Sequence, residues 1–175
     1  ILNLIGGTTD EAPARGAGGS IRGGLSASQV RAQQMFVDAT DAEPDTIRAI
    51  GHAALAAATP ESGRMRRNLA LVLQNTSWPD GRLHITAVDA YTGERCVITK
   101  AAGVRTNRAA AASSAVPGLF PTQTIADRRL MDGGVSGSGT HLDLVSGARR
   151  VLVLSVVDGT DRAASDDHAR RGDHR

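Results

Sequence analysis

The carboxylate with the clearest chemical setting is Asp132, which stands in the stretch RRLMDGG at the end of a short apolar run. A side chain placed directly after a strand lies at the edge of a sheet, where α/β proteins bind their ligands. Gly133 and Gly134 can adopt backbone angles that other residues avoid, and they place no side chains beside the carboxylate. This setting suits a general base. The structural alternative is an aspartate that caps a turn before glycines, which is a common arrangement.

A segment of small residues precedes this aspartate. Residues 109–121 read AAAASSAVPGLFP, and their small side chains allow a helix to pack closely against a sheet. The helix must stop at Pro117, which cannot continue it. An ordinary alanine-rich helix would not explain why this segment is followed so closely by Asp-Gly-Gly.

Helical and extended patterns alternate along the chain, which predicts an α/β fold. Pro44 and Pro60 suit the first turns of two helices, and Thr92-Gly93 suits the turn of a hairpin. The last apolar run, RRVLVLSVV, is typical of a strand covered on both faces. Helices are expected within 28–37, 41–59, 60–77, 106–116 and 140–148, hairpins within 82–100 and 121–131, and that strand at 149–157.

The composition limits the classes of partner. Aromatic residues make up only 2% of the chain and the net charge is +2, so the core must be aliphatic and no nucleic-acid partner is expected. Cys96 is the single cysteine and is expected to be a buried, reduced thiol, and His52 is expected to be structural. No cluster has the spacing of a metal site. No apolar run is long enough to span a membrane and the start lacks a signal peptide, so a cytoplasmic protein is expected.

At residues 112–121 (ASSAVPGLFP) and 124–134 (TIADRRLMDGG) the chain resembles the patatin-like phospholipases. The strand RRVLVLSV and the upstream stretch WPDGRLHITAVDAYTGE, residues 78–94, fit the same order of elements, so the resemblance covers about residues 41–157. It implies a three-layer α/β/α fold and a Ser-Asp dyad in which Asp132 takes the proton of the serine. It also implies a lipid or other ester substrate, transient contact with a lipid surface, and neither metal nor cofactor.

The sequence departs from the family at the nucleophile. The family's G-x-S-x-G elbow is absent from all 175 residues. Ser20 follows Gly18 but has Arg22 two residues after it, and Ser138 comes after the aspartate instead of before it. Ser113 and Ser114 belong to the small-residue helix. None of these serines is a credible nucleophile.

The oxyanion loop is equally poorly defined. Residues 18–23, GGSIRG, resemble the family's G-G-G-x-R-G, which makes Gly18 and Gly19 weak oxyanion candidates beside the simpler interpretation of a glycine-rich linker. Nucleotide binding by this region is disfavoured, because it lacks the Lys-Ser/Thr of a P-loop and a complete G-x-G-x-x-G.

Three segments are therefore expected. Residues 1–29 form an uncertain Gly/Ser-rich segment, 30–157 a partial patatin-like domain, and 158–175 a polar tail that is expected to be disordered. We expect a fragment that retains the aspartate of a serine acyl hydrolase and lacks its nucleophile. The alternative is a patatin-like module that has lost catalysis and serves in binding or as a scaffold.

Overall fold

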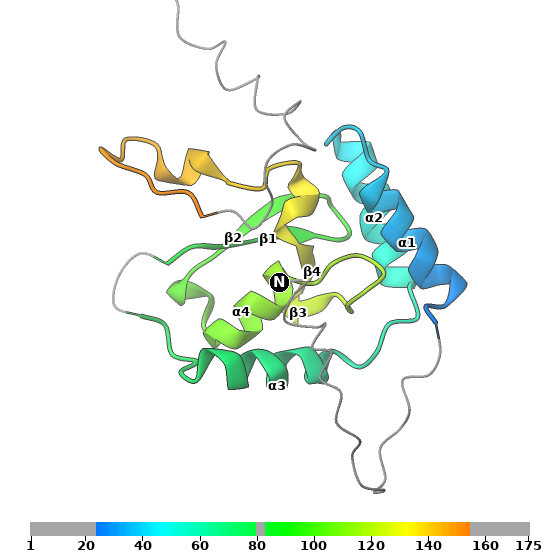
Figure 1. Ribbon diagram of the computed structural model, residues 1–175, viewed down its shortest axis with the longest axis horizontal. Helices are drawn as coiled ribbons and strands as arrows, with labels where there is room; N and C mark the ends of the chain where they lie inside the picture. The colour runs from blue at the N-terminus through cyan, green and yellow to red at the C-terminus, as the bar shows by residue number, and fades with distance from the viewer. Residues whose placement is uncertain (1–23, 80–82, 155–175) are drawn as a thin grey trace, which may run out of the picture.

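The computed structural model describes residues 24–79 and 83–154. Its centre is a four-stranded antiparallel sheet with the strand order β2-β1-β4-β3 (Figure 1). The two hairpins expected from the sequence are present, and they meet where β1 pairs with β4. The strands are β1 (Ile85–Asp89), β2 (Arg95–Ile98), β3 (Gln123–Ile125) and β4 (Arg128–Asp132).

The alternation of side chains along the two central strands divides the core into two clusters. Val88 of β1 lies opposite Met131 of β4, and both are fully buried on one face of the sheet. Ala87 and Leu130 are buried on the other face. Because neighbouring residues of a strand point to opposite faces, each hairpin contributes to both clusters.

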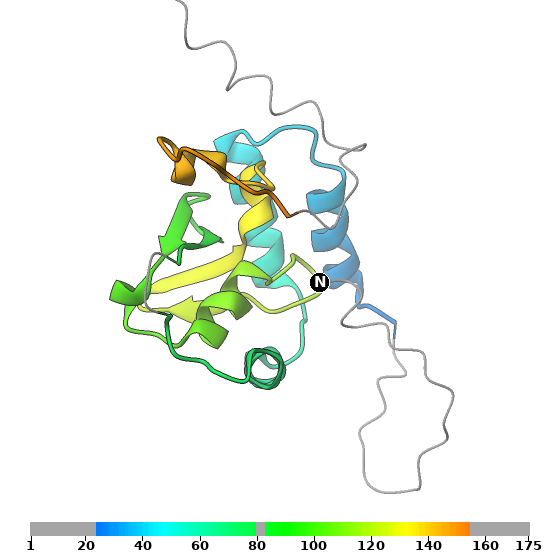
Figure 2. The same cartoon turned by 60° about the vertical axis from the view of Figure 1, so that its left-hand side comes forward.

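Helices α1 (Ala27–Val37) and α2 (Pro44–Ala56) cover the first face of the sheet (Figure 2). A capping box starts α1: the Ser26 hydroxyl accepts the Gln29 N–H while the Gln29 side chain accepts the Ser26 N–H. Pro44 begins α2, as expected, and Ile47 and Ile50 point into the core. These features fix the helices that support the sheet from this side.

Helix α4 (Thr106–Ser113) covers the other face, and α3 (Ser62–Leu73) packs on the outside of α4 (Figure 1). Ala109 and Ala112 are fully buried against the sheet, so the small side chains of α4 do allow the expected close packing. Helices thus lie on both faces of the sheet, in agreement with the expected α/β/α arrangement, and α4 ends before Pro117.

Several expectations are wrong. Residues 151–154 form no strand and are exposed, with Leu152 at 84% and Leu154 at 88%, because no neighbouring strand or helix of the described chain covers them. Cys96 is half-buried, since β2 is the edge of the sheet. His52 is exposed, because the buried face of α2 is formed by residues 47, 50, 51 and 54. The helix expected within 140–148 is a single 3₁₀ turn, Leu142–Val145.

Candidate functional site

Asp132 is the last residue of β4, at the point where the chain leaves the sheet. It lies opposite Ala87 of β1, and its N–H donates to the carbonyl of Ala115, 3.1 Å away, just beyond the end of α4. Two strands and the end of a helix therefore hold its backbone. The expected position at the end of a strand is confirmed by this arrangement.

The carboxylate of Asp132 makes a local hydrogen bond. Its Oδ1 accepts the N–H of Gly134 at 2.8 Å and caps the 3₁₀ turn η3 (Gly133–Ser136). Among residues 24–79 and 83–154, Oδ2 has neither a hydrogen bond nor an ion pair. Oδ1 thus caps the turn, and Oδ2 has no partner in the part of the chain that the structure describes.

The surroundings of Asp132 favour its protonated form. The side chain is half-buried, and the loss of water around it raises the pKa of the Asp132 carboxyl above its usual range. The hydrogen bond from the Gly134 N–H acts in the opposite direction but is the smaller effect. A carboxylate with a raised pKa is a stronger proton acceptor than an exposed aspartate, which is consistent with general-base chemistry.

Of the two roles expected for the glycines after Asp132, the structure supports the absence of side chains beside the carboxylate but not the need for unusual backbone angles. Neither has a positive φ, so the turn does not need the backbone freedom of glycine. Gly133 instead lies against β1, where a Cβ would stand 2.7 Å from Thr86 Oγ1 and 2.8 Å from the Thr86 carbonyl oxygen. A Cβ on Gly134 would stand 3.1 Å from Asp132 Oδ1. The glycines therefore allow close contact with β1 and keep the space beside the carboxylate clear.

The segment between α4 and β3 is attached to α1 by contacts that the sequence did not reveal. Gln29 Nε2 donates to the carbonyl of Gly118 at 3.0 Å in a buried hydrogen bond. Gly118 has a φ of 78°, and a Cβ there would collide with the backbone of Gln29. The sequence signal here was Pro117, which predicted the end of a helix and not a contact with a residue 89 positions away from Gly118.

The described serines near Asp132 have structural roles. Ser114 is buried at the C-terminal cap of α4, and Ser136 Oγ donates to the Gly133 carbonyl at 2.8 Å. Ser138 Oγ accepts the His141 N–H at 2.9 Å. No hydrogen bond joins a serine of the described ranges to Asp132. Gly18, Gly19 and Ser20 lie outside the described residues.

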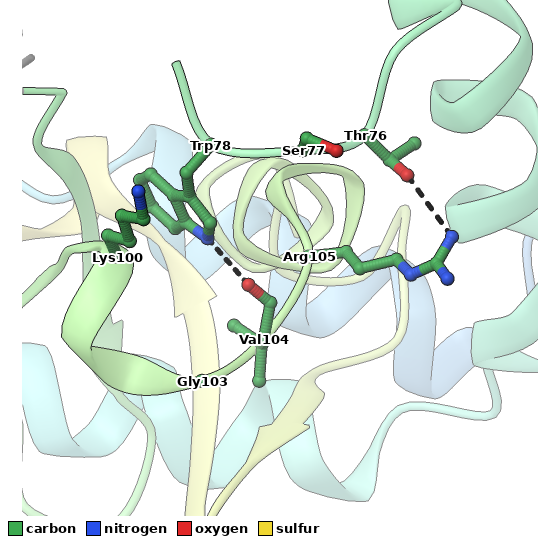
Figure 3. A pocket seen from close by; sticks show the side chains of 7 residues that line it. All are labelled: Thr76, Ser77, Trp78, Lys100, Gly103, Val104 and Arg105. Atoms are coloured by element: carbon green, nitrogen blue, oxygen red, sulfur yellow. Dashed lines mark hydrogen bonds between the residues drawn. The ribbon is translucent and has the colours of Figure 1, made fainter. Parts of the chain in front are cut away.

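A separate open pocket lies at the opposite end of α4 (Figure 3). It has a volume of about 480 Å³ and does not include Asp132. Trp78 Nε1 donates to the Val104 carbonyl at 2.6 Å, and Arg105 Nη1 lies 3.5 Å from Thr76 Oγ1. The pocket is lined by Thr76, Ser77, Trp78, Lys100, Gly103, Val104 and Arg105.

Two further properties concern only the described ranges. No group of three or more histidine, cysteine, aspartate or glutamate side chains is placed to hold a metal ion there. None of the helices in those ranges combines the length and the apolar character that crossing a bilayer requires.

Comparison with known proteins gives one match. No curated protein and no solved structure matches the chain. The family model described as "Patatin-like phospholipase" matches residues 18–144, which includes α4, both hairpins and Asp132. Because this match covers well over half of the 175 residues, the chain belongs to the patatin-like phospholipase family.

Proposed function

We propose that this chain carries the base of a patatin-like lipid acyl hydrolase, and that Asp132 is that base. The observation that supports this most directly is that only one of the two carboxylate oxygens of Asp132 has a hydrogen-bond partner in the described structure. Oδ1 is held by the Gly134 N–H at 2.8 Å, while Oδ2 has no partner among the described residues. The raised pKa of Asp132 is consistent with the same role. The proposed substrate is a lipid or another carboxylic ester, and the proposed location is the cytoplasm.

The proposed step is a proton transfer coupled to acyl transfer. Asp132 accepts the proton of a serine hydroxyl as the serine oxygen bonds to the ester carbonyl carbon. The bond from that carbon to the leaving oxygen then breaks, and the leaving alcohol takes the proton from the carboxyl group. Water hydrolyses the acyl-serine by the same route. The step requires neither a metal ion nor a diffusible cofactor.

The second candidate is a non-enzymatic patatin-like module that binds lipid. The absence of G-x-S-x-G from the sequence favours it, because a base without a nucleophile and oxyanion donors cannot perform this reaction. For this chain by itself we therefore expect no ester hydrolysis above the buffer rate. The acyl hydrolase requires that a longer reading frame supply the serine.

The test compares two substitutions of the same kind in β4 and its hairpin. Asp132→Asn removes the proposed base, and Asp127→Asn removes an exposed carboxylate from the β3–β4 turn. Hydrolysis of short-chain nitrophenyl esters is measured for the chain alone and for any longer product of the same gene that contains G-x-S-x-G. In the longer product, Asp132→Asn should lower kcat roughly 10²–10⁴-fold, as loss of a general base does, and Asp127→Asn should not change it.

Two results would contradict the proposal in different ways. Turnover by the chain alone that Asp132→Asn abolishes would show that the nucleophile is already present. Turnover by the longer product that survives Asp132→Asn would remove the catalytic role from Asp132. If no reading frame supplies the elbow, the binding module is the remaining candidate.

A further inference from the structure

Helix α3 presents an unusual outer surface. Arg64, Arg67 and Leu71 are spaced by three and four residues, so they lie on one side of the helix. Leu71 is 79% exposed and the next residue, Val72, is 54% exposed. Gly63 is the only buried residue of α3, so this helix has apolar side chains that the described chain does not bury.

The opposite side of α3 holds the helix to the protein. Asn107 Nδ2 of α4 donates to the carbonyl of Arg66 at 3.1 Å. Both ribbon views show α3 at the periphery, on the side of α4 that faces away from the sheet (Figures 1 and 2). The stripe of Arg64, Arg67 and Leu71 therefore points away from the folded domain and is available to a partner.

The same side of the molecule carries several cations that lack acidic partners. None of the ion pairs among the described residues involves Arg64, Arg66 or Arg67 of α3. Lys100 and Arg105, which line the pocket beyond the end of α3, are also without an ion pair in those ranges. Glu61 is the acidic side chain beside them: its Oε1 and Arg67 Nη1 would each lie 3.1 Å from a Cβ on Gly63, yet the two form no ion pair. Cations that outnumber the acidic side chain beside them, next to exposed leucine and valine, are complementary to a surface that is both apolar and negatively charged.

The pocket adds hydrogen-bond donors to this surface. The hydroxyls of Thr76 and Ser77 and the cations of Lys100 and Arg105 line an open space of about 480 Å³ (Figure 3). Such donors suit a phosphate group. The half-buried ring of Trp78 lies at the same opening, and tryptophan favours the boundary between lipid and water.

We propose that α3 and this pocket form a docking surface for membranes that contain anionic phospholipids. The docking surface consists of Arg64, Arg67, Leu71, Val72, Lys100 and Arg105. Leucine and valine would enter the lipid boundary, the cations would pair with headgroup phosphates, and the pocket would accept one headgroup. This inference rests on the proposed function and extends it, because it names the surface through which a lipid acyl hydrolase, or a non-enzymatic module, binds the membrane.

A second protein chain fits this surface less well. The exposed aliphatic side chains at the end of α3 are Leu71, Val72 and Leu73. Three such side chains fall well short of the roughly 800 Å² per partner that a stable protein interface buries. A membrane needs no such area, because the attraction of each cation to an anionic surface adds to the insertion of a few apolar side chains.

Docking can be tested without any turnover, because vesicle binding requires no hydrolysis and the pocket does not include Asp132. The full chain is mixed with phosphatidylcholine vesicles that contain 0% or 30% phosphatidylglycerol, and bound protein is measured by flotation. Trp78 is the only tryptophan, so its quenching by acrylamide reports whether this face is covered. We expect binding only to the anionic vesicles, weaker binding at 0.5 M salt, and protection of Trp78 on binding.

Each substitution has a matched control on another surface. Arg64→Gln and Arg67→Gln should each weaken vesicle affinity roughly fivefold, whereas Arg31→Gln on α1 should leave it unchanged. Leu71→Ser should weaken affinity roughly tenfold, whereas Leu152→Ser, at an equally exposed leucine, should not. Circular dichroism confirms that each variant is folded, as expected for exposed positions.

Three outcomes would overturn the docking surface. The first is equal binding to neutral vesicles, and the second is a loss of binding with Leu152→Ser instead of Leu71→Ser. The third is a chain that ignores vesicles but changes its molar mass in light scattering when Leu71 is replaced, which would assign the surface to a protein partner. These results are independent of the Asp132 assay, so docking and catalysis can fail separately.

Discussion

Replacing Gly133 by alanine tests whether the turn at Asp132 depends on close contact with β1. A Cβ on Gly133 would stand 2.7 Å from Thr86 Oγ1, 2.8 Å from the Thr86 carbonyl oxygen and 3.1 Å from its carbonyl carbon. Two of these three atoms belong to the backbone of a central strand, which cannot move without disturbing its pairing with β2 and β4. Gly133→Ala should therefore separate the start of η3 from β1.

The magnitude follows from a comparison with Gly139→Ala. A Cβ on Gly139 would meet nothing within 4 Å, and its φ is not positive. Both substitutions reduce the entropy of the unfolded chain by a similar amount, about 0.4–1 kcal/mol, so this contribution cancels in the difference. What remains is the cost of overpacking, about 1–3 kcal/mol in the free energy of unfolding. In a chain of this size the two melting temperatures should differ by about 2–12 °C.

The measurement is urea unfolding of the native protein, Gly133→Ala, Gly139→Ala and the double variant Gly133→Ala/Thr86→Ala. Removing Thr86 Oγ1 relieves one of the close contacts but leaves the carbonyl oxygen at 2.8 Å. The double-mutant cycle should therefore show partial rescue. Equal stability of Gly133→Ala and Gly139→Ala would refute the close approach, and complete rescue would show that only the Thr86 side chain was in the way.

Two further predictions concern Asp132 and Cys96. Burial raises the pKa of Asp132, so the protonated carboxyl stabilises the folded state, and this stabilisation is lost as pH rises through the folded pKa. Asp132→Asn keeps an oxygen for the Gly134 N–H. The variant should therefore have a higher free energy of unfolding than the native protein at pH 7 and no higher a value near pH 3. Urea unfolding at both pH values checks this, with Asp127→Asn as the control for losing a carboxylate, and an advantage that grows at low pH would contradict it. Cys96 is half-buried at the edge strand, so a disulfide reagent should modify it in the folded protein; a reaction that requires urea would show that the thiol is covered.

Much of the element order could be predicted from the sequence, because local patterns determine it. Pro44 marks the start of α2, Gly93 adopts a φ of 75° in the β1–β2 turn, and the small side chains of α4 lie against the sheet. Each of these signals acts within a few residues. They were sufficient for helices α1 to α4, the two hairpins and the position of Asp132 at the end of β4, but not for the helix expected within 140–148.

Features that depend on distant partners could not be predicted in the same way. The run at residues 151–154 is as apolar as a buried strand, yet it is exposed because burial requires a neighbour that a run of valines and leucines does not specify. The hydrogen bond between Gln29 and Gly118 joins residues 89 positions apart. The contact of Gly133 with Thr86 likewise depends on the pairing of β1 with β4.

The environment of Asp132 reconciles the two roles that the sequence left as alternatives. A capping aspartate needs one oxygen toward a backbone N–H, and a general base needs one oxygen toward an alcohol. The Gly134 N–H donates to Oδ1 at 2.8 Å, and this hydrogen bond orients the carboxyl group. It leaves Oδ2 without a partner among the described residues. Because a fixed carboxylate loses less freedom when it meets its substrate, the cap would help the proposed base by orienting it, while the same hydrogen bond lowers the pKa of the carboxyl. On this view the three residues of the Asp-Gly-Gly sequence act together: Gly133 allows the turn to contact β1, and Gly134 supplies the N–H that orients the carboxylate. Asp132 then keeps Oδ2 for the proposed substrate alcohol.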